Sequence, residues 1–218
     1  MKTIKQIISL LIILSLSSCS DWFDVSPKSE IKSDKLFTTE AGFRDALIGV
    51  YSMLVTKESY GCELTYGYVD VLAQYYTVSG NEHKYSKTIS FEYDNIDEQE
   101  MIDGIWARAY QSIMNLNAIL HFIDDRKDIF STEENFNIIK GEALALRAFI
   151  HFDILRLFAP IPSFENSANG IPYANKYTNI AQQQQSVENV INLIMDDLAE
   201  ASKFLSNVGP DNNLFEES

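Results

Sequence analysis

The densest group of side chains able to hold a small molecule lies between positions 66 and 93. It comprises Asp70, Gln74, Tyr75, Tyr76, Asn81, His83, Tyr85 and Tyr93. Aromatic rings can stack on the apolar C–H faces of a sugar, while carboxylates and amides bond its rim of hydroxyls. The ligand-binding candidates are therefore Asp70, Gln74, Tyr75, Tyr76, Asn81 and Tyr85. The alternative is that tyrosines such as Tyr66, Tyr68 and Tyr75 are core aromatics with bonded hydroxyls.

Other titratable residues do not form an arrangement typical of catalysis or metal binding. A hydrolase needs paired carboxylates or a nucleophile with its base. The densest acidic run lies where a loop is predicted to meet a helix, and the helix dipole accounts for acids there. It consists of Asp94, Asp97, Glu98, Glu100 and Asp103. The three histidines show no ligand spacing to one another or to Cys62. We expect no enzyme activity, no metal and no cofactor.

The first 18 residues have the pattern of a lipoprotein export signal. Lys2 and Lys5 precede an apolar run from Ile7 to Leu16 that is too short to span a bilayer, and small residues lead to Cys19. The mature chain should begin at Cys19, and acylation of its thiol and new amine would give stable membrane anchoring. The alternative is an ordinary secretory signal in which Cys19 is incidental.

Charge and cysteine content limit the partners. The 218 residues include 31 acidic and 17 basic side chains, for a net charge of −14. Nucleic acid is therefore an unsuitable partner, and an acidic surface repels an anionic leaflet, so membrane attachment should depend on the lipid at Cys19. With Cys19 acylated, Cys62 has no partner for a disulfide within the chain. We expect Cys62 to be a small buried hydrophobe.

Helical spacing dominates the central part of the chain. Thr39 is predicted to cap a helix whose apolar stripe runs to Leu54, and further helices are predicted at about 63–78 and 98–124. Ser131 and Glu134 fit a capping box before a helix from Phe136 to Phe158, and Pro160 and Pro162 then stop it. Ser186 is predicted to cap a last amphipathic helix that extends to Leu205.

The intervening segments are predicted to be loops. Residues 79–97 lack helical period, so a long loop, with short irregular strands as an option, is expected there. Residues 159–185 are predicted to be a polar loop in which the glutamine tract Gln182 to Gln185 is a solvated connector. The predicted organisation is a signal at 1–18, a lipidated tether at 19–36, a helical domain at 37–206 and an unstructured tail at 207–218.

The helix that ends at Phe158 is apolar on nearly every face, so it should be buried on several sides by neighbouring helices. Arg147 and Arg156 within it must find a partner or reach water. We expect them to anchor helix packing through Glu142, Asp153 or backbone carbonyls, and we do not count them as site residues. No segment alternates convincingly as a strand. The predicted class is all-α, with small and aromatic residues that loosely fit tetratricopeptide-like helix pairs.

Four segments, which occur in the expected order along the chain, resemble the SusD/RagB family of surface glycan-binding lipoproteins. They are Asp21-Trp22-Phe23-Asp24-Val25-Ser26-Pro27, the run from Gly141 to Pro162, Gly170-Ile171-Pro172-Tyr173, and the stretch from Ser186 to Ala201. Ala159 differs from the glycine usual in the family. The resemblance implies tetratricopeptide-like helical repeats with long irregular loops.

The resemblance also implies a function and a location. It implies glycan capture without bond cleavage, in partnership with a TonB-dependent outer-membrane transporter of the SusC type, for nutrient uptake. Asp21 and Asp24 after the lipidated cysteine resemble a surface-export signal, so the protein is expected at the exterior of the outer membrane. Family members look longer, and a second half of their fold is expected to be absent from this chain. Two other interpretations stay open: a helical-repeat scaffold lipoprotein without a small-molecule site, and a lipoprotein glycosidase.

Overall fold

The computed structural model describes residues 33–161, 169–209, 212 and 214–215. The chain divides into two compact units, Met1–Lys35 and Leu36–Ser218, and only the end of the first is described. Helix α2, Ser33–Leu36, occupies the end of the predicted tether. The predicted signal peptide and Cys19 lie outside the described residues. Among the helices that are described, none is long and apolar enough to cross a membrane.

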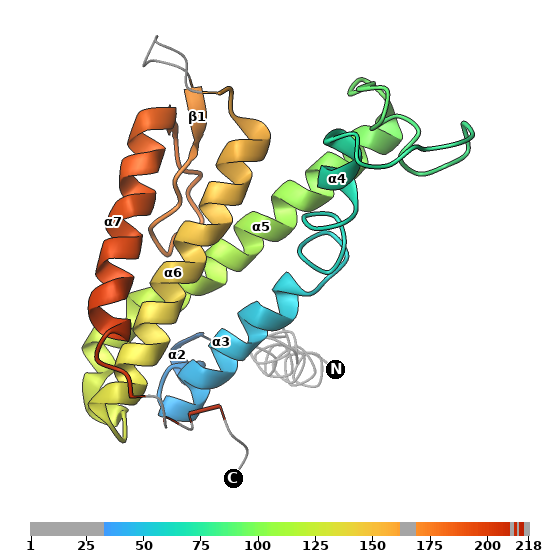
Figure 1. Ribbon diagram of the computed structural model, residues 1–218. Helices are drawn as coiled ribbons and strands as arrows, with labels where there is room; N and C mark the ends of the chain where they lie inside the picture. The colour runs from blue at the N-terminus through green and yellow to red at the C-terminus, as the bar shows by residue number, and fades with distance from the viewer. Residues whose placement is uncertain (1–32, 162–168, 210–211, 213, 216–218) are drawn as a thin grey trace, which may run out of the picture. The chain divides into compact units, whose positions relative to one another are not determined.

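Four long helices build the second unit (Figure 1). They are α3 (Glu40–Leu54), α5 (Ile96–Ile123), α6 (Glu133–Phe158) and α7 (Val187–Leu205). Helix α6 packs against both α7 and α5, and α3 packs against α5 and α6. A 3-10 turn, η2 (Asp124–Ile129), joins α5 to α6. The all-α class predicted from the sequence is confirmed.

Side-chain caps explain where the helices begin. The Thr39 hydroxyl accepts the Gly42 N–H, and the Ser186 hydroxyl accepts the Asn189 N–H, as predicted. Helix α6 differs, because Thr132 and not Ser131 is its cap. Ser131 instead donates both its N–H and its hydroxyl to the Glu40 carboxylate, so a contact between distant segments displaces the predicted capping box.

The helix predicted at 63–78 is wrong. Only α4, Tyr68–Leu72, is helical there, within a turn-rich segment, residues 56–95, that we call the arm. The Glu63 carboxylate accepts the Tyr68 N–H, which starts the short helix, and Gln74 with φ 61° ends it. Residues 79–95 contain no strand, so the optional irregular strands are absent from this described loop.

The loop predicted at 159–185 contains a two-stranded antiparallel sheet. Strand β1, Asn169–Pro172, pairs with β2, Gln184–Ser186, and Asn169 lies opposite Ser186. The glutamine tract is therefore not only a solvated connector, because Gln184 lies in β2 and its amide donates to the Gly170 carbonyl at 2.6 Å. We call residues 173–183, which connect the two strands, the strap.

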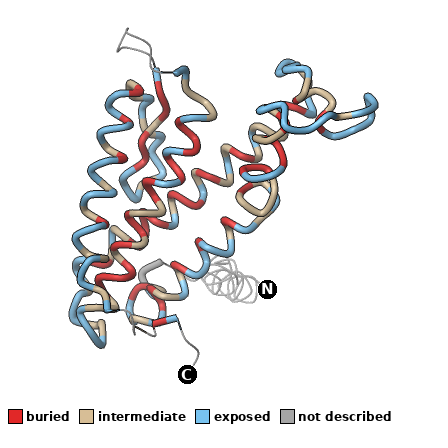
Figure 2. Tube along the Cα trace, viewed as in Figure 1, coloured by how far each residue is buried: buried red, intermediate tan, exposed pale blue. Residues whose placement is uncertain are grey.

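The core lies where α3, α5, α6 and α7 face one another (Figure 2). Helix α6 is buried on several sides as predicted, and Ile139, Ile150 and Ile154 are fully enclosed. Its burial is incomplete on one face, because the Phe149 and Phe152 side chains are 47% and 50% exposed.

The described part of the predicted tail contacts the start of α6. Leu214 is buried, and the Asn212 amide donates to Asn135 at 3.2 Å. The Gly209 N–H donates to the Glu134 carboxylate. These contacts give the described residues of the 207–218 segment fixed partners in the helical unit.

Candidate functional site

The arm is held together by a buried carboxylate. Glu63 is only 3% exposed and accepts the Tyr85 hydroxyl at 2.7 Å, while Lys84 forms an ion pair with it at 3.3 Å. Burial and the Glu63 carboxylate raise the pKa of Tyr85 well above its usual range. Tyr85 therefore stays a neutral donor, and the turns on either side of α4 are tied together.

A second buried carboxylate attaches the arm to α5. Glu98 accepts the Thr88 hydroxyl at 2.7 Å, and both side chains are buried. Burial, followed by the nearby Glu98 carboxylate, raises the pKa of Tyr68 above its usual range. Glu98 lies in the first turn of α5, which agrees with the prediction that the acidic run marks a helix start. It also anchors the arm to this helix.

The arm and the end of α6 enclose a cavity of about 450 Å³, which we call the arm pocket. Its arm side is lined by Leu64, Thr65, Val69, Asp70, Leu72, Ala73 and Tyr75, and its helical side by Asp153, Arg156 and Leu157. A cavity of this size lies within the range of small-molecule sites. It combines an exposed aromatic ring with carboxylates and a guanidinium.

The α6 side of the arm pocket is fixed by an ion pair. The Arg156 Nε donates to Asp153 Oδ1 at 2.7 Å, and the Tyr60 hydroxyl donates to Asp153 Oδ2 at 2.8 Å. Asp153 is buried, whereas the Arg156 side chain is 58% exposed. Asp153 was among the partners predicted for the arginines, so this pairing is confirmed. The pair also places the Arg156 guanidinium at the pocket, a position that the sequence did not suggest.

The structure separates the predicted ligand-binding candidates. Asp70 and the 77% exposed Tyr75 line the arm pocket. Tyr76 and Tyr85, together with His83, line a different cavity of about 380 Å³. Within the described residues, the Asp70 carboxylate accepts no hydrogen bond and forms no ion pair, so it is available to a ligand.

Gln74 and Asn81 line neither cavity. The Gln74 amide donates to the carbonyls of Val71 and Ile89, each at 3.4 Å, and so bridges two turns of the arm. Asn81 is exposed, and its carbonyl accepts the Ser86 hydroxyl. Among the tyrosines considered as core aromatics, Tyr68 is buried, whereas Tyr66 and Tyr75 are exposed. Cys62 is half-buried, with its Sγ 3.8 Å from the Tyr85 hydroxyl.

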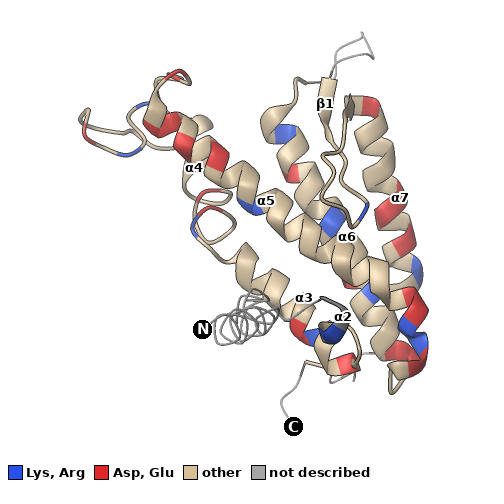
Figure 3. Cartoon of the chain, turned by 180° about the vertical axis from the view of Figure 1, so that it is seen from behind, with Lys and Arg blue, Asp and Glu red and all other residues tan. Residues whose placement is uncertain are grey.

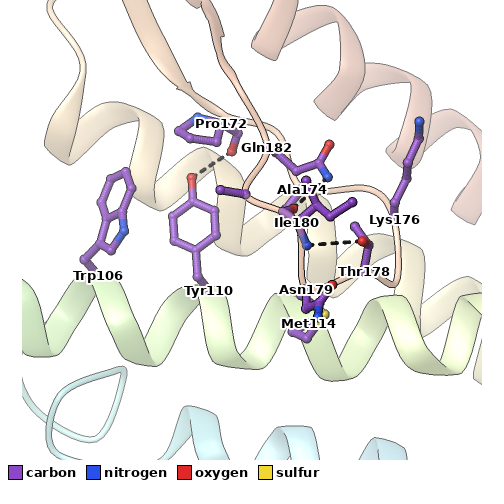
Figure 4. Close-up of a pocket in the computed structure, with 11 residues that line it drawn as sticks. Trp106, Tyr110, Met114, Pro172, Ala174, Lys176, Thr178, Asn179, Ile180 and Gln182 are labelled. Carbon is purple, nitrogen blue, oxygen red and sulfur yellow. Dashed lines mark hydrogen bonds between the residues drawn. The ribbon is translucent and has the colours of Figure 1, made fainter.

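A third cavity, of about 280 Å³, lies between α5 and the strap, and we call it the strap pocket (Figure 4). Helix α5 contributes Trp106, Tyr110 and Met114 to it, and the other side is formed by Pro172 and the strap. The spacing of Trp106 and Tyr110 puts them on one helix face. From the sequence, this spacing indicates only that the two rings share a helix face. It does not predict that they face a segment more than 60 positions away.

The partner predicted for Arg147 is wrong. Its guanidinium forms two 2.7 Å hydrogen bonds with Asp197 on α7 and donates at 2.8 Å to Asn117 on α5. Glu142, one predicted partner, instead accepts the Tyr51 hydroxyl. Arg147 therefore joins three helices, because the bidentate geometry of a carboxylate on α7 satisfies it better than a neighbour on its own helix.

Among the described residues, no group of three or more His, Cys, Asp or Glu side chains is arranged to hold a metal ion. Acidic side chains gather at the start of α5 and along α7 (Figure 3). The described lining of the arm pocket offers an aromatic face, hydrogen-bonding groups and charge.

Solved structures share this helical architecture. A SusD superfamily protein from Bacteroides thetaiotaomicron matches with a TM-score of 0.62 at 20% identity, over 76% of this chain and 37% of that one. A SusD-like carbohydrate binding protein from Bacteroides vulgatus matches with a TM-score of 0.61 at 21% identity, over 76% of this chain and 36% of that one. The fold is that of the SusD superfamily.

The chain belongs to the SusD-like family whose description is starch-binding, associating with the outer membrane, and the family model matches residues 21–215. SusD-like proteins P25 and P38 of Formosa agariphila are 23% and 26% identical to it over 216 residues. These matches cover 97% of this chain and 40% of each relative. The chain thus spans about two fifths of the length of these curated relatives.

Proposed function

We propose that the protein is a glycan-binding lipoprotein of the outer membrane that captures oligosaccharide in the arm pocket without cleaving it. The observation that carries the proposal is the joint lining of one cavity by Asp70, Tyr75 and Arg156. The family description of starch binding supports carbohydrate as the ligand class.

The geometry of the arm pocket suits a sugar. The exposed Tyr75 ring offers a flat apolar face, and the Asp70 carboxylate and Arg156 guanidinium offer charged hydrogen bonds to hydroxyls. Arg156 is held by Asp153, so little ordering of that side chain is needed when a ligand binds.

Binding without hydrolysis is favoured by the state of the carboxylates. Glycoside hydrolysis uses two carboxyl groups that are free to act as an acid and as a base or nucleophile. Asp153 already accepts hydrogen bonds from Arg156 and from Tyr60. Of the two carboxylates in the described pocket lining, Asp70 is therefore the one that is not already engaged and can bond a ligand.

The sequence pattern and the family resemblance support the proposed location and partner. Acylation at Cys19 would attach the protein to the outer membrane, and Asp21 and Asp24 favour display at the cell exterior. The partner that the family resemblance implies is a TonB-dependent, SusC-like transporter, to which the captured glycan would be passed for uptake. Loss of fatty-acid labelling in Cys19→Ala tests the anchor, and a variant that is still labelled and membrane-bound contradicts it.

Calorimetry with starch-derived oligosaccharides tests the ligand and the site together. We expect Tyr75→Ala to weaken binding roughly tenfold, because removing the stacking face costs about 1–2 kcal/mol. Arg156→Gln should weaken it by a similar factor, and Tyr93→Ala is the matched control because Tyr93 is exposed outside the arm pocket.

The same preparations separate the rival functions. Release of reducing ends that follows the purified protein would favour a glycosidase. Absence of binding to starch-derived and other neutral oligosaccharides would favour a helical scaffold without a small-molecule site.

A further inference from the structure

The backbone that borders the strap pocket is anchored by side chains from several helices. The Tyr110 hydroxyl on α5 donates to the Pro172 carbonyl at 2.7 Å, and the Asn117 amide donates to the Ala174 carbonyl at 2.8 Å. On α6, His151 Nε2 accepts the Ala174 N–H at 3.0 Å. Because these buried backbone groups all have hydrogen-bond partners, they hold the start of the strap in one conformation.

The Arg147 network adds a second attachment. The Tyr173 hydroxyl donates at 2.5 Å to Asp197, the carboxylate that Arg147 also engages, and the Tyr173 ring stacks on His151 with centroids 4.0 Å apart. Strap residues 173 and 174 are therefore fixed to α6 and α7 before any ligand arrives. A preorganised wall reduces the entropy cost of binding.

The floor of the strap pocket is aromatic. The rings of Trp106 and Tyr110 lie 4.7 Å apart at an interplanar angle of 38°, and Phe158 supports Trp106 edge-on at 5.0 Å. Figure 4 shows both side chains rising from α5 toward the strap. Because its hydroxyl is bonded to Pro172, Tyr110 contributes its ring face to the floor.

The opposite wall mixes apolar side chains, among them Ile180, with polar ones, and it is almost neutral. It carries the side chains of Thr178, Asn179 and Gln182, and none of the described lining residues is acidic. The single charged residue of the lining is Lys176, and its side chain extends away from the aromatic floor (Figure 4). The chain as a whole has a net charge of −14, but the strap pocket lacks an acidic group to attract a cation and has little to attract an anion.

We propose that the strap pocket is a second carbohydrate site, separate from the arm pocket, that holds a single neutral sugar ring. The ring stacks on Trp106 and Tyr110, and its hydroxyls bond the amides of Asn179 and Gln182. A cavity of about 280 Å³ is near the lower limit of small-molecule sites, which suits one ring better than a chain. The choice of carbohydrate rests on the proposed function, but the site is tested independently of the arm pocket.

Trp106 itself can report binding. The chain has two tryptophans, so Trp22→Phe leaves Trp106 as the only one in the full chain. We expect glucose, galactose, mannose or N-acetylglucosamine to change its emission saturably. Asn179→Ala with Gln182→Ala should weaken that response roughly tenfold, the effect of losing one or two hydrogen bonds. If the double variant folds poorly, Asn179→Ala alone replaces it in the test. This position is exposed, and we expect a smaller loss of the response from the single change.

Two controls separate this site from the arm pocket and from anionic ligands. Tyr75→Ala should leave the Trp106 response unchanged, because Tyr75 lines the arm pocket and not the strap pocket. No saturable response to any of the four sugars overturns the proposal, even where calorimetry still detects binding in the arm pocket. A response to glucuronate that exceeds the response to glucose and disappears in Lys176→Ala also overturns it, because the pocket is then an anion site.

Discussion

The arm and the strap are both irregular segments that shape a pocket, but they are anchored in different ways. In the arm, the Glu63 to Tyr85 bond joins residues 22 positions apart, and the Glu98 to Thr88 bond joins residues 10 apart. In the strap, the bond from Asn117 to Ala174 spans 57 positions, and at Pro172, the β1 residue that leads into the strap, the bond from Tyr110 spans 62. Local acids hold the arm, whereas side chains from three helices hold the strap.

This difference predicts how each pocket responds to damage. The strap adopts its conformation only when α5, α6 and α7 have assembled, so its stability should follow that of the whole helical unit. The arm contains most of its own anchors and should be able to loosen while the helices remain folded. The variants below test that distinction, in order of decreasing expected effect.

Arg147→Ala should be the most damaging change. It removes the guanidinium that pairs with the largely buried Asp197 carboxylate, and it leaves Asn117 Oδ1 without its hydrogen-bond donor. We expect the free energy of unfolding in urea to fall by about 3–5 kcal/mol. Arg156→Ala is the matched control on the same helix. Its side chain is 58% exposed and Asp153 keeps the Tyr60 hydroxyl as a donor, so this variant should cost less, about 1–2 kcal/mol. Equal losses in the two variants would contradict the account of the strap.

Acid should weaken the strap through His151. Burial, and then the nearby Arg147 charge, lowers the pKa of His151 from its ordinary 6.5 to about 4. Between these values the unfolded chain binds a proton that the folded chain does not, so stability falls as the pH drops from about 6.5 toward 4. The loss from this residue should be roughly 3 kcal/mol.

The comparison of two histidine variants isolates this effect. In urea unfolding between pH 7 and 4, His151→Gln should show a shallower pH dependence than the unmodified protein. His121→Gln, at an exposed position, should retain the full dependence. Parallel profiles for all three proteins would show that His151 does not act in this way.

Glu63→Gln should loosen the arm alone. The change removes the negative charge of the carboxylate that accepts the Tyr85 hydroxyl and pairs with Lys84. We expect the free energy of unfolding to fall by about 1–3 kcal/mol. Hydrogen exchange should accelerate at the amides of Tyr68 and Tyr85 but not at that of Ala174. Glu92→Gln, which breaks an exposed ion pair with Lys87 in the same arm, should leave both unchanged. Faster exchange at Ala174 would show that the two segments are not independent.

Sequence predicted the regular parts of the fold well. Apolar spacing located the four long helices, and Thr39 and Ser186 were correct caps because each bond closes within three residues. The helix expected at 63–78 failed because the Glu63 side chain competes for backbone and hydroxyl donors of the arm. The sheet was missed because β1 and β2 are short and pair across the strap.

The site was only partly predictable for the same reason. Asp70 and Tyr75 could be chosen because their residue types are informative and they are close in sequence. Arg156 and Asp153 complete the arm pocket from a helix some 80 positions later, and only a packing role was predicted for them. Trp106 and Tyr110 meet the strap through a contact between segments whose pairing no local pattern specifies.

A crystal structure of the protein with a bound starch-derived oligosaccharide tests the central claim most directly. The account predicts a sugar ring stacked on Tyr75, with hydroxyls bonded to the Asp70 carboxylate and the Arg156 guanidinium, and an intact glycosidic bond. An oligosaccharide bound elsewhere on the molecule, with the arm pocket empty, would contradict it.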